Sequence, residues 1–211
     1  MNDLSETINK AADLVHRLTG PVCDDIGAMI SDSMKPYRAK NLVNTLRKTE
    51  RILQEAGLPA NAVPTRLLFP IVEASSIEDD ETLQEMWAGL LATASQETDS
   101  ASPSFAETLK QMTPDEARCI DEIYGNRTDP NKPHLALDEQ LGFGNFRDKA
   151  FVETYERLGI IRREYGLTME GGETEVGSLL RFTKYGVAFL AACRGPRPPI
   201  DSHGDPTIMR A

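Results

Sequence analysis

Residues 83–94 read LQEMWAGLLATA, and this stretch decides how the chain folds. Its apolar residues recur at i, i+3, i+4, i+7, i+8 and i+11, which places them on one face of a helix; they are Leu83, Met86, Trp87, Leu90, Leu91 and Ala94. Trp87 is the only tryptophan, and we expect it in the hydrophobic core. The four acids at positions 78–81 are predicted to cap this helix rather than bind a cation, because acids satisfy free amides at a helix N-terminus.

Helical periodicity extends outward from this stretch over most of the first hundred residues. Residues 22–56 are predicted to be helical, with a kink or a break at Pro36, because proline lacks a backbone donor and clashes with the preceding turn. Pro70 is expected to disturb the middle of a short apolar helix in the same way. The remaining helices predicted in this part of the chain cover residues 4–18, 64–75, 103–112 and 114–124.

The last third of the chain changes character. Its pattern predicts a helix over 146–158, strands over 159–163 and 178–182 around a polar, glycine-rich stretch, and a helix over 184–193. This order is the plan of a winged helix. Residues 182–186, Phe-Thr-Lys-Tyr-Gly, resemble the Leu-Thr-x-x-Gly step at which many winged-helix domains leave their wing, where the threonine caps the helix and the glycine permits close packing.

These elements predict a mainly α fold with a small β-hairpin, built from an N-terminal helical region and a C-terminal winged-helix-like module. The expected organisation is N-terminal helices over 1–57, a helical core region over 64–112, the winged-helix-like module over 113–193 and a tail over 194–211. The tail is rich in proline and is predicted to be disordered.

Composition limits the classes of function. The 211 residues include 23 Lys and Arg against 33 Asp and Glu, and the net charge of −10 opposes attraction to nucleic acid or anionic lipid. The chain contains neither an apolar run long enough to span a membrane nor a signal-peptide core, so a cytoplasmic location is expected. The three cysteines are far apart, which predicts free thiols and no metal site, and no cofactor is expected.

A basic cluster interrupts the acidic N-terminal half. Residues 35–51 hold six bases against Glu50, a local charge of +5. Four of the bases share roughly one helical face, and they are the candidate residues for binding a protein partner: Lys40, Arg47, Lys48 and Arg51. An ordinary solvated face is the competing interpretation.

Nucleic-acid binding by the winged-helix-like module is the alternative function, and the charges oppose it. The candidate recognition helix over 146–158 has no net charge, and the wing over 164–177 carries four acids and no base. A wing that contacts phosphates needs lysine or arginine, because counterion release supplies most of the affinity. The candidate contacts under this alternative are Arg162, Arg163 and Arg181.

Catalytic motifs are not found, so we predict that the chain is not an enzyme. Neither a glycine-rich phosphate loop nor a Ser-His-Asp pattern is present. Arg127 lies seven positions before His134, a spacing that resembles toxin ribonucleases of the HEPN type. Chance accounts for this spacing, and a ribonuclease toxin is the third and weakest alternative.

Two runs carry a family resemblance, LLFPIVEASSIEDDETLQEMWAGLLATASQ and SPSFAETLKQMTPDEARCIDEIY. Over residues 64–124 the chain resembles a bacterial family called Abi-alpha, for abortive infection alpha. The resemblance implies an association with phage defence and brings no catalytic residue with it. We therefore expect a cytosolic interaction protein of a bacterial phage-defence system that acts by protein contact, and self-association remains open.

Overall fold

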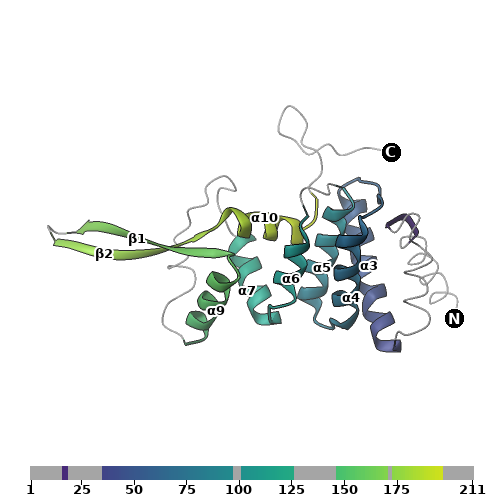
Figure 1. Ribbon diagram of the computed structural model, residues 1–211, viewed down its shortest axis with the longest axis horizontal. Coiled ribbons are helices and arrows are strands. Elements are labelled where there is room, and N and C mark those ends of the chain that lie inside the picture. The colour runs from purple at the N-terminus through teal and green to yellow at the C-terminus, as the bar shows by residue number, and fades with distance from the viewer. Residues whose placement is uncertain (1–15, 19–34, 97–100, 126–145, 171–172, 197–211) are drawn as a thin grey trace, which may run out of the picture. The chain divides into compact units, whose positions relative to one another are not determined.

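The computed structural model describes residues 16–18, 35–96, 101–125, 146–170 and 173–196. It is mainly helical with one small two-stranded sheet, as predicted (Figure 1). The chain forms two compact units, Met1–Pro114 with Ala191–Ala211, and Asp115–Leu190. The elements are α3 (Pro36–Glu55), α4 (Thr65–Ile77), α5 (Glu81–Ala94), α6 (Pro103–Leu109), α7 (Pro114–Gly125), α9 (Phe146–Arg157), β1 (Ile161–Glu170), β2 (Glu173–Phe182) and α10 (Lys184–Cys193).

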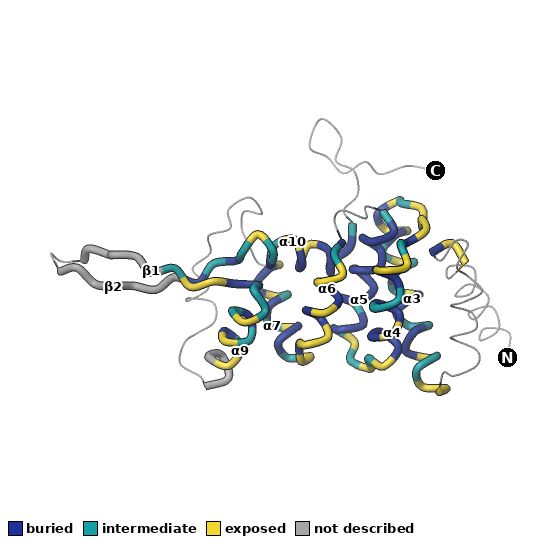
Figure 2. The backbone as a smooth tube through the Cα atoms, viewed as in Figure 1, coloured by how far each residue is buried: buried dark blue, intermediate teal, exposed yellow. Residues whose placement is uncertain are grey.

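The first unit is built around α5. Helices α3, α4 and α6 pack against it (Figure 1), and its residues are buried from 83 to 94 except Glu85 (Figure 2). Trp87 is 1% exposed, which confirms its expected place in the core. The prediction of one apolar face was too narrow, since Gln84, Gly89 and Thr93 on the other sides are buried too. Small side chains on those sides let neighbouring backbone approach closely.

The closest approach lies at Gly89. A Cβ atom at this position would lie 2.0 Å from the carbonyl oxygen of Cys193, where the chain returns to the first unit. Beside it, Thr93 Oγ1 donates a hydrogen bond to the carbonyl oxygen of Ala192 at 2.9 Å. Gly195 is buried next to Ile52 with a φ of +83°, a conformation that favours glycine. The tail predicted over 194–211 therefore includes a residue of the packed fold, since Gly195 is buried in the first unit.

The two prolines behave differently. Helix α3 begins at Pro36 after an extended Lys35, as expected for a break at this proline, whereas the part of the predicted helix before residue 35 lies outside the described residues. Helix α4 continues through Pro70, and the expected disturbance is wrong. Pro70 is half-exposed and Arg66, four residues earlier, is exposed. The carbonyl group that loses its intrahelical partner is therefore open to hydration.

The second unit has the predicted order of helix, strand, strand and helix. Strands β1 and β2 are antiparallel, with a register that runs from Ile161 opposite Phe182 to Glu170 opposite Glu173. The hairpin projects beyond the helices of this unit (Figure 1). Both strands are longer than predicted, because most of the glycine-rich stretch also pairs; its alternating polar and apolar residues suit a strand despite the glycines.

The base of the hairpin is fixed by Thr183 and Gly186. The backbone N–H of Gly186 donates to Thr183 Oγ1 at 2.8 Å, which caps α10 as expected. A Cβ atom at Gly186 would lie 2.0 Å from the carbonyl oxygen of Ile160, so the close packing expected of this glycine is confirmed. Helix α10 has the predicted bounds.

Tyr155 joins α9 to α7 inside the second unit. Its ring is fully buried, and its hydroxyl donates to the carbonyl oxygen of Glu116 at 2.7 Å. Burial raises the pKa of the Tyr155 hydroxyl far above its ordinary value. Tyr155 therefore serves as a neutral hydrogen-bond donor that positions two helices.

We predict that Trp87→Ala lowers the free energy of unfolding by about 3–5 kcal/mol, because the ring leaves a large cavity in a core that cannot close around it. The native protein should also show blue-shifted tryptophan fluorescence. Denaturant unfolding followed by circular dichroism measures the first effect. Tyr37→Ala, which removes an aromatic ring that is 53% exposed, is the matched control and should change stability little. Water-like emission from Trp87 would contradict the packing described above.

Candidate partner-binding surface

Ion pairs divide the four candidate cations of α3 into two exposed residues and two that acids engage. Lys40 and Arg47 are exposed, lie seven residues apart and thus project from nearly the same side of the helix. In the described part of the chain neither side chain makes a hydrogen bond or an ion pair. Lys48 and Arg51 lie farther along α3 and are engaged by acids of the same unit.

Lys48 is held by the first turns of α5. Its Nζ pairs with Glu81 Oε1 and lies 3.6 Å from Glu85 Oε2, and its side chain is only 13% exposed. Arg51 pairs with Glu85 and, at 3.2 Å, with Glu55 Oε1 one turn along α3. The hydrogen bond that Arg51 donates to Glu85 is the main reason that the pKa of Arg51 lies above its ordinary value. Of the four candidate cations, Lys40 and Arg47 are therefore the two that no acid in the described structure engages.

Residues that the sequence analysis missed lie at the N-terminal end of the same helix. Tyr37 on α3 and Ile77 on α4 are 53% and 60% exposed. Between the helices that carry them, the Arg38 guanidinium donates to Ser76 Oγ through Nε at 3.0 Å and Nη2 at 2.7 Å. One signal could have identified Ile77, which falls on nearly the opposite side of the helix from the apolar face formed by Leu67, Leu68, Ile71 and Val72.

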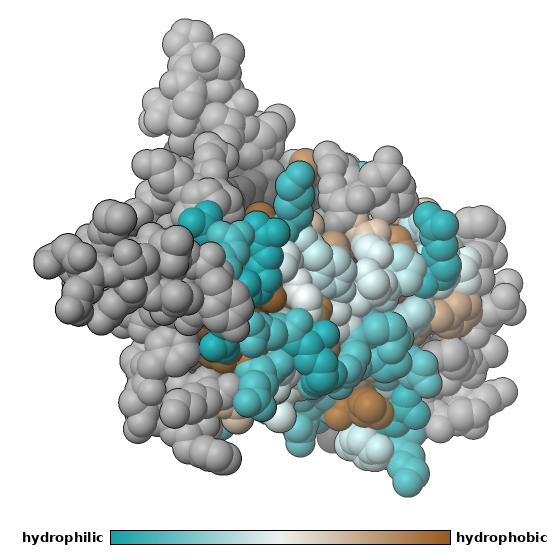
Figure 3. All heavy atoms as spheres, turned by 60° about the vertical axis from the view of Figure 1, so that its left-hand side comes forward, coloured by the Kyte–Doolittle hydropathy of each residue, from teal (hydrophilic) through white to brown (hydrophobic). Residues whose placement is uncertain are grey.

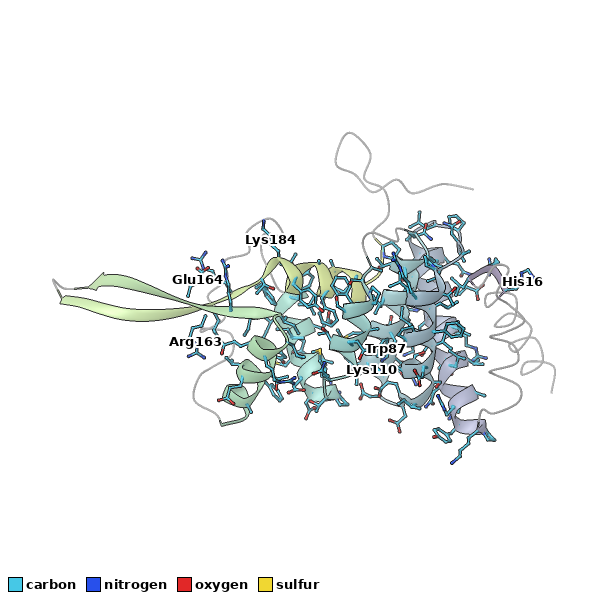
Figure 4. The ribbon with its side chains drawn as sticks, in the orientation of Figure 1. His16, Trp87, Lys110, Arg163, Glu164 and Lys184 are labelled. Carbon is cyan, nitrogen blue, oxygen red and sulfur yellow. The ribbon has the colours of Figure 1, made fainter. Side chains whose placement is uncertain are left out.

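The three arginines of the nucleic-acid alternative are all paired with acids. Glu164 contacts Arg162 at 2.5 Å and Arg181 at 2.7 Å. Arg163 contacts Glu156 of α9 at 3.4 Å. Arg163 and Glu164 lie on opposite sides of the hairpin base (Figure 4). Each arginine would have to exchange a carboxylate for a phosphate before contributing to nucleic-acid binding.

The acids at positions 78–81 form the start of α5. Asp80 Oδ1 accepts hydrogen bonds from the backbone N–H groups of Thr82 at 2.9 Å and Leu83 at 3.1 Å, which confirms the predicted capping. Glu78 Oε1 accepts from the backbone N–H of Asp80 at 3.1 Å. Partial burial raises the pKa of Glu78, and the charges of Asp80 and Asp79 act in the same direction, although backbone hydrogen bonds oppose them.

The remaining candidate features are the residues of the ribonuclease alternative, the cysteines, and any metal site or membrane span. Arg127 and His134, the residues of the ribonuclease alternative, lie outside the described residues, as does Cys23. Neither Cys119 nor Cys193 forms a disulfide in the described part of the chain. Within the ranges that the structure describes, no group of three His, Cys, Asp or Glu side chains could hold a metal ion, and none of the helices there is long and apolar enough to cross a membrane.

Hydrophilic side chains predominate on the face in Figure 3, where hydrophobic ones form small separate patches.

Comparison with known proteins gives one match. The family model described as abortive infection alpha matches residues 38–193 of the chain. This range includes both Lys40 and Arg47 and extends through the described elements to the end of α10. Searches of curated proteins and of solved structures found no match.

The raised pKa of Glu78 predicts how stability depends on pH. The folded state holds a proton on this carboxyl at a pH where the unfolded chain has released it, so stability falls as pH rises from the unfolded value of about 4.3 through the raised folded value. Glu78→Gln should be more stable than the wild type at pH 7, and the difference should shrink at pH 4. Denaturant midpoints at both pH values test this. Glu73→Gln, which removes an exposed carboxylate of α4, is the control, and an equal response from it would contradict the assignment.

Proposed function

The chain belongs to the abortive infection alpha family, and we propose that it acts in phage defence by binding an acidic protein partner through Lys40 and Arg47. Family membership supports the setting, since the family is named for abortive infection. The surface supports the mode of action. The observation that carries the proposal is that these two cations are exposed and meet no acid among the described residues, while the neighbouring Lys48 and Arg51 are neutralised.

The surrounding charge strengthens this proposal. Outside the segment 35–51, the first hundred residues contain three bases against 15 acids. An isolated positive area on an acidic chain produces a local field that steers an acidic partner to one place and turns it away elsewhere. The same arrangement excludes most nonspecific contacts with nucleic acid.

We further propose that α9, the β1–β2 hairpin and α10 form a winged-helix-like module that serves protein contact or structure. The pairing of Arg162, Arg163 and Arg181 with glutamates supports this use over nucleic-acid binding. We assign the chain no enzymatic step. Its location is proposed to be the cytoplasm, and Cys119 and Cys193, which form no disulfide in the described structure, suit a reducing compartment.

The charge reversal Lys40→Glu with Arg47→Glu is predicted to abolish phage protection, so that plaque counts return to those of cells without the protein. Both side chains are exposed, so the variant should unfold within about 0.5 kcal/mol of the wild type. Arg66→Glu with Lys184→Glu is the matched control, because it makes the same change in net charge at exposed cations elsewhere. Arg51 is left unchanged because its reversal would break pairs inside the fold.

His134→Ala distinguishes this proposal from the ribonuclease alternative. Under the interaction proposal it leaves protection unchanged, because His134 has no chemical role. Protection that is lost in His134→Ala and retained in the charge reversal would refute protein contact as the mode of action.

Generic duplex DNA is predicted to bind no more tightly than about the micromolar range at physiological salt, because the acidic chain gains little from counterion release. Fluorescence anisotropy with a labelled duplex measures the affinity. Arg162→Glu with Arg163→Glu should leave the weak signal unchanged. Tight, salt-sensitive binding that this variant removes would instead establish the nucleic-acid alternative.

A further inference from the structure

The large hydrophobic side chains that remain exposed in the described ranges, Tyr37 and Ile77, lie on separate faces of the first unit. Helices α3 and α4 run antiparallel, because Arg38 at the start of α3 donates hydrogen bonds to Ser76 at the end of α4. These two residues face each other, and neighbouring residues of a helix point about 100° apart. The residue before Arg38 and the residue after Ser76 therefore lie on opposite sides of the helix pair.

The side of α3 that carries Tyr37 is positively charged. Lys40 and Arg47 follow Tyr37 by three and ten residues, so both lie within about a quarter of a turn of it around the helix. All three side chains are exposed. We call them the α3 face.

The side of α4 that carries Ile77 is negatively charged. Glu73 lies one turn before Ile77 and is exposed, and the half-exposed Pro70 lies nearly one turn earlier on the same side. Asp79, also exposed, follows just beyond the end of the helix at Ile77. Neither acid belongs to an ion pair among the residues that the structure describes. We call these four residues the α4 face.

We propose that the acidic partner of the α3 face is a second copy of this chain, which presents its α4 face. This inference rests on the proposed function and names its partner. Helix α3 of one copy lies parallel to α4 of the next. Lys40 then meets the second copy's Glu73, and Arg47 meets the second copy's Asp79.

Matched spacing and charge support this partner. Lys40 and Arg47 lie seven residues, about 10 Å, apart along α3. Glu73 and Asp79 lie six residues apart, with an extended step at the end of α4, and therefore span a similar distance. The α4 face thus has what the α3 face requires of a partner, two exposed acids at the right spacing with an apolar side chain between them.

The apolar contacts fall beside and between the charged ones. In the register set by the two ion pairs, Tyr37 lies opposite the second copy's Pro70. Ile77 lies between the aliphatic stems of the two cations. Arg66, an exposed cation on the same side of α4, falls before the first residue of the opposing α3 and so does not oppose its cations.

The two faces lie on different sides of each copy, so one contact leaves an unused face at either end. Such a head-to-tail contact continues beyond two copies and produces a ring or a filament. With few apolar side chains, the interface belongs at the low end of interface sizes, and a dissociation constant on the order of 10 µM is expected.

Sedimentation velocity of the full chain at physiological salt, over about 1 to 200 µM, tests the assembly. The wild type should shift from monomer to species larger than a dimer. Tyr37→Glu places an acid beside the second copy's Glu73, and Ile77→Arg places a cation between Lys40 and Arg47, so each variant alone should be monomeric. Their equimolar mixture should form a one-to-one dimer and nothing larger, because only one intact pair of faces remains.

A charge exchange tests the register. Lys40→Glu and Glu73→Lys should each weaken association about tenfold, whereas their mixture and the double variant Lys40→Glu/Glu73→Lys should assemble as the wild type does. The control Arg66→Glu with Lys184→Glu should also assemble normally. Thermal melts of each variant confirm that changes at these exposed positions have not altered folding.

Plaque counts separate failure of this inference from failure of the proposed function. Ile77→Arg keeps Lys40 and Arg47 and should nevertheless abolish protection. A wild type that stays monomeric or stops at a dimer overturns the second copy as partner, and so does a monomeric Ile77→Arg that still protects. If Lys40→Glu with Arg47→Glu abolishes protection in either case, the partner is a different acidic protein and the proposed function stands. Protection that survives this charge reversal refutes the proposed function itself.

Discussion

The close contact between Gly89 and the chain at Cys193 is the constraint on which the first unit depends. Every residue of α5 from 83 to 94 except Glu85 is buried, so backbone as well as side chains packs against this helix. A Cβ atom at position 89 would lie 2.0 Å from the carbonyl oxygen of Cys193. Glycine at this point lets the end of α10 lie against α5, and Thr93 beside it satisfies the carbonyl of Ala192. Gly89 and Thr93, in the middle of the chain, therefore determine how residues 192–195 pack against α5. The cost of a glycine in a helix, about 1 kcal/mol relative to alanine, is small beside the contacts that it permits.

The ion pairs between α3 and α5 serve orientation more than stability. Exposed pairs such as Arg51 with Glu55 and Glu85 contribute at most about 1 kcal/mol each, because water and salt already screen the separated charges. Lys48 differs because its side chain is 13% exposed. Removing its acids would leave a largely covered side chain whose ammonium has lost both carboxylate partners. These pairs thus fix the register of the two helices and keep Lys48 and Arg51 from an external ligand.

The sequence predicted those parts of the fold that depend on local signals. The bounds of α10, the start of α3 at Pro36 and the cap at Asp80 all follow from residues within one turn of the feature they determine. The burial of Gln84 and Thr93 could not be predicted, because polar residues on a helix are ordinarily taken as solvent-facing. The basic cluster was identified from composition alone. Its division into paired and unpaired cations was not, since Glu81 and Glu85 lie 33 and 34 residues from Lys48 and Arg51 in the chain.

The pairing of cations with acids also determines which cations of each unit are available to a ligand. The second unit has arginines at the base of its hairpin, the place at which a nucleic-acid-binding wing would need them, and each is paired with a glutamate. The first unit has acids close enough to neutralise Lys48 and Arg51, yet none of the described acids reaches Lys40 or Arg47. Because paired and unpaired cations lie on one helix within four turns, solvation alone does not distinguish them. Position relative to the acidic start of α5 does, and it leaves Lys40 and Arg47 as the candidate cations with charge to offer a partner.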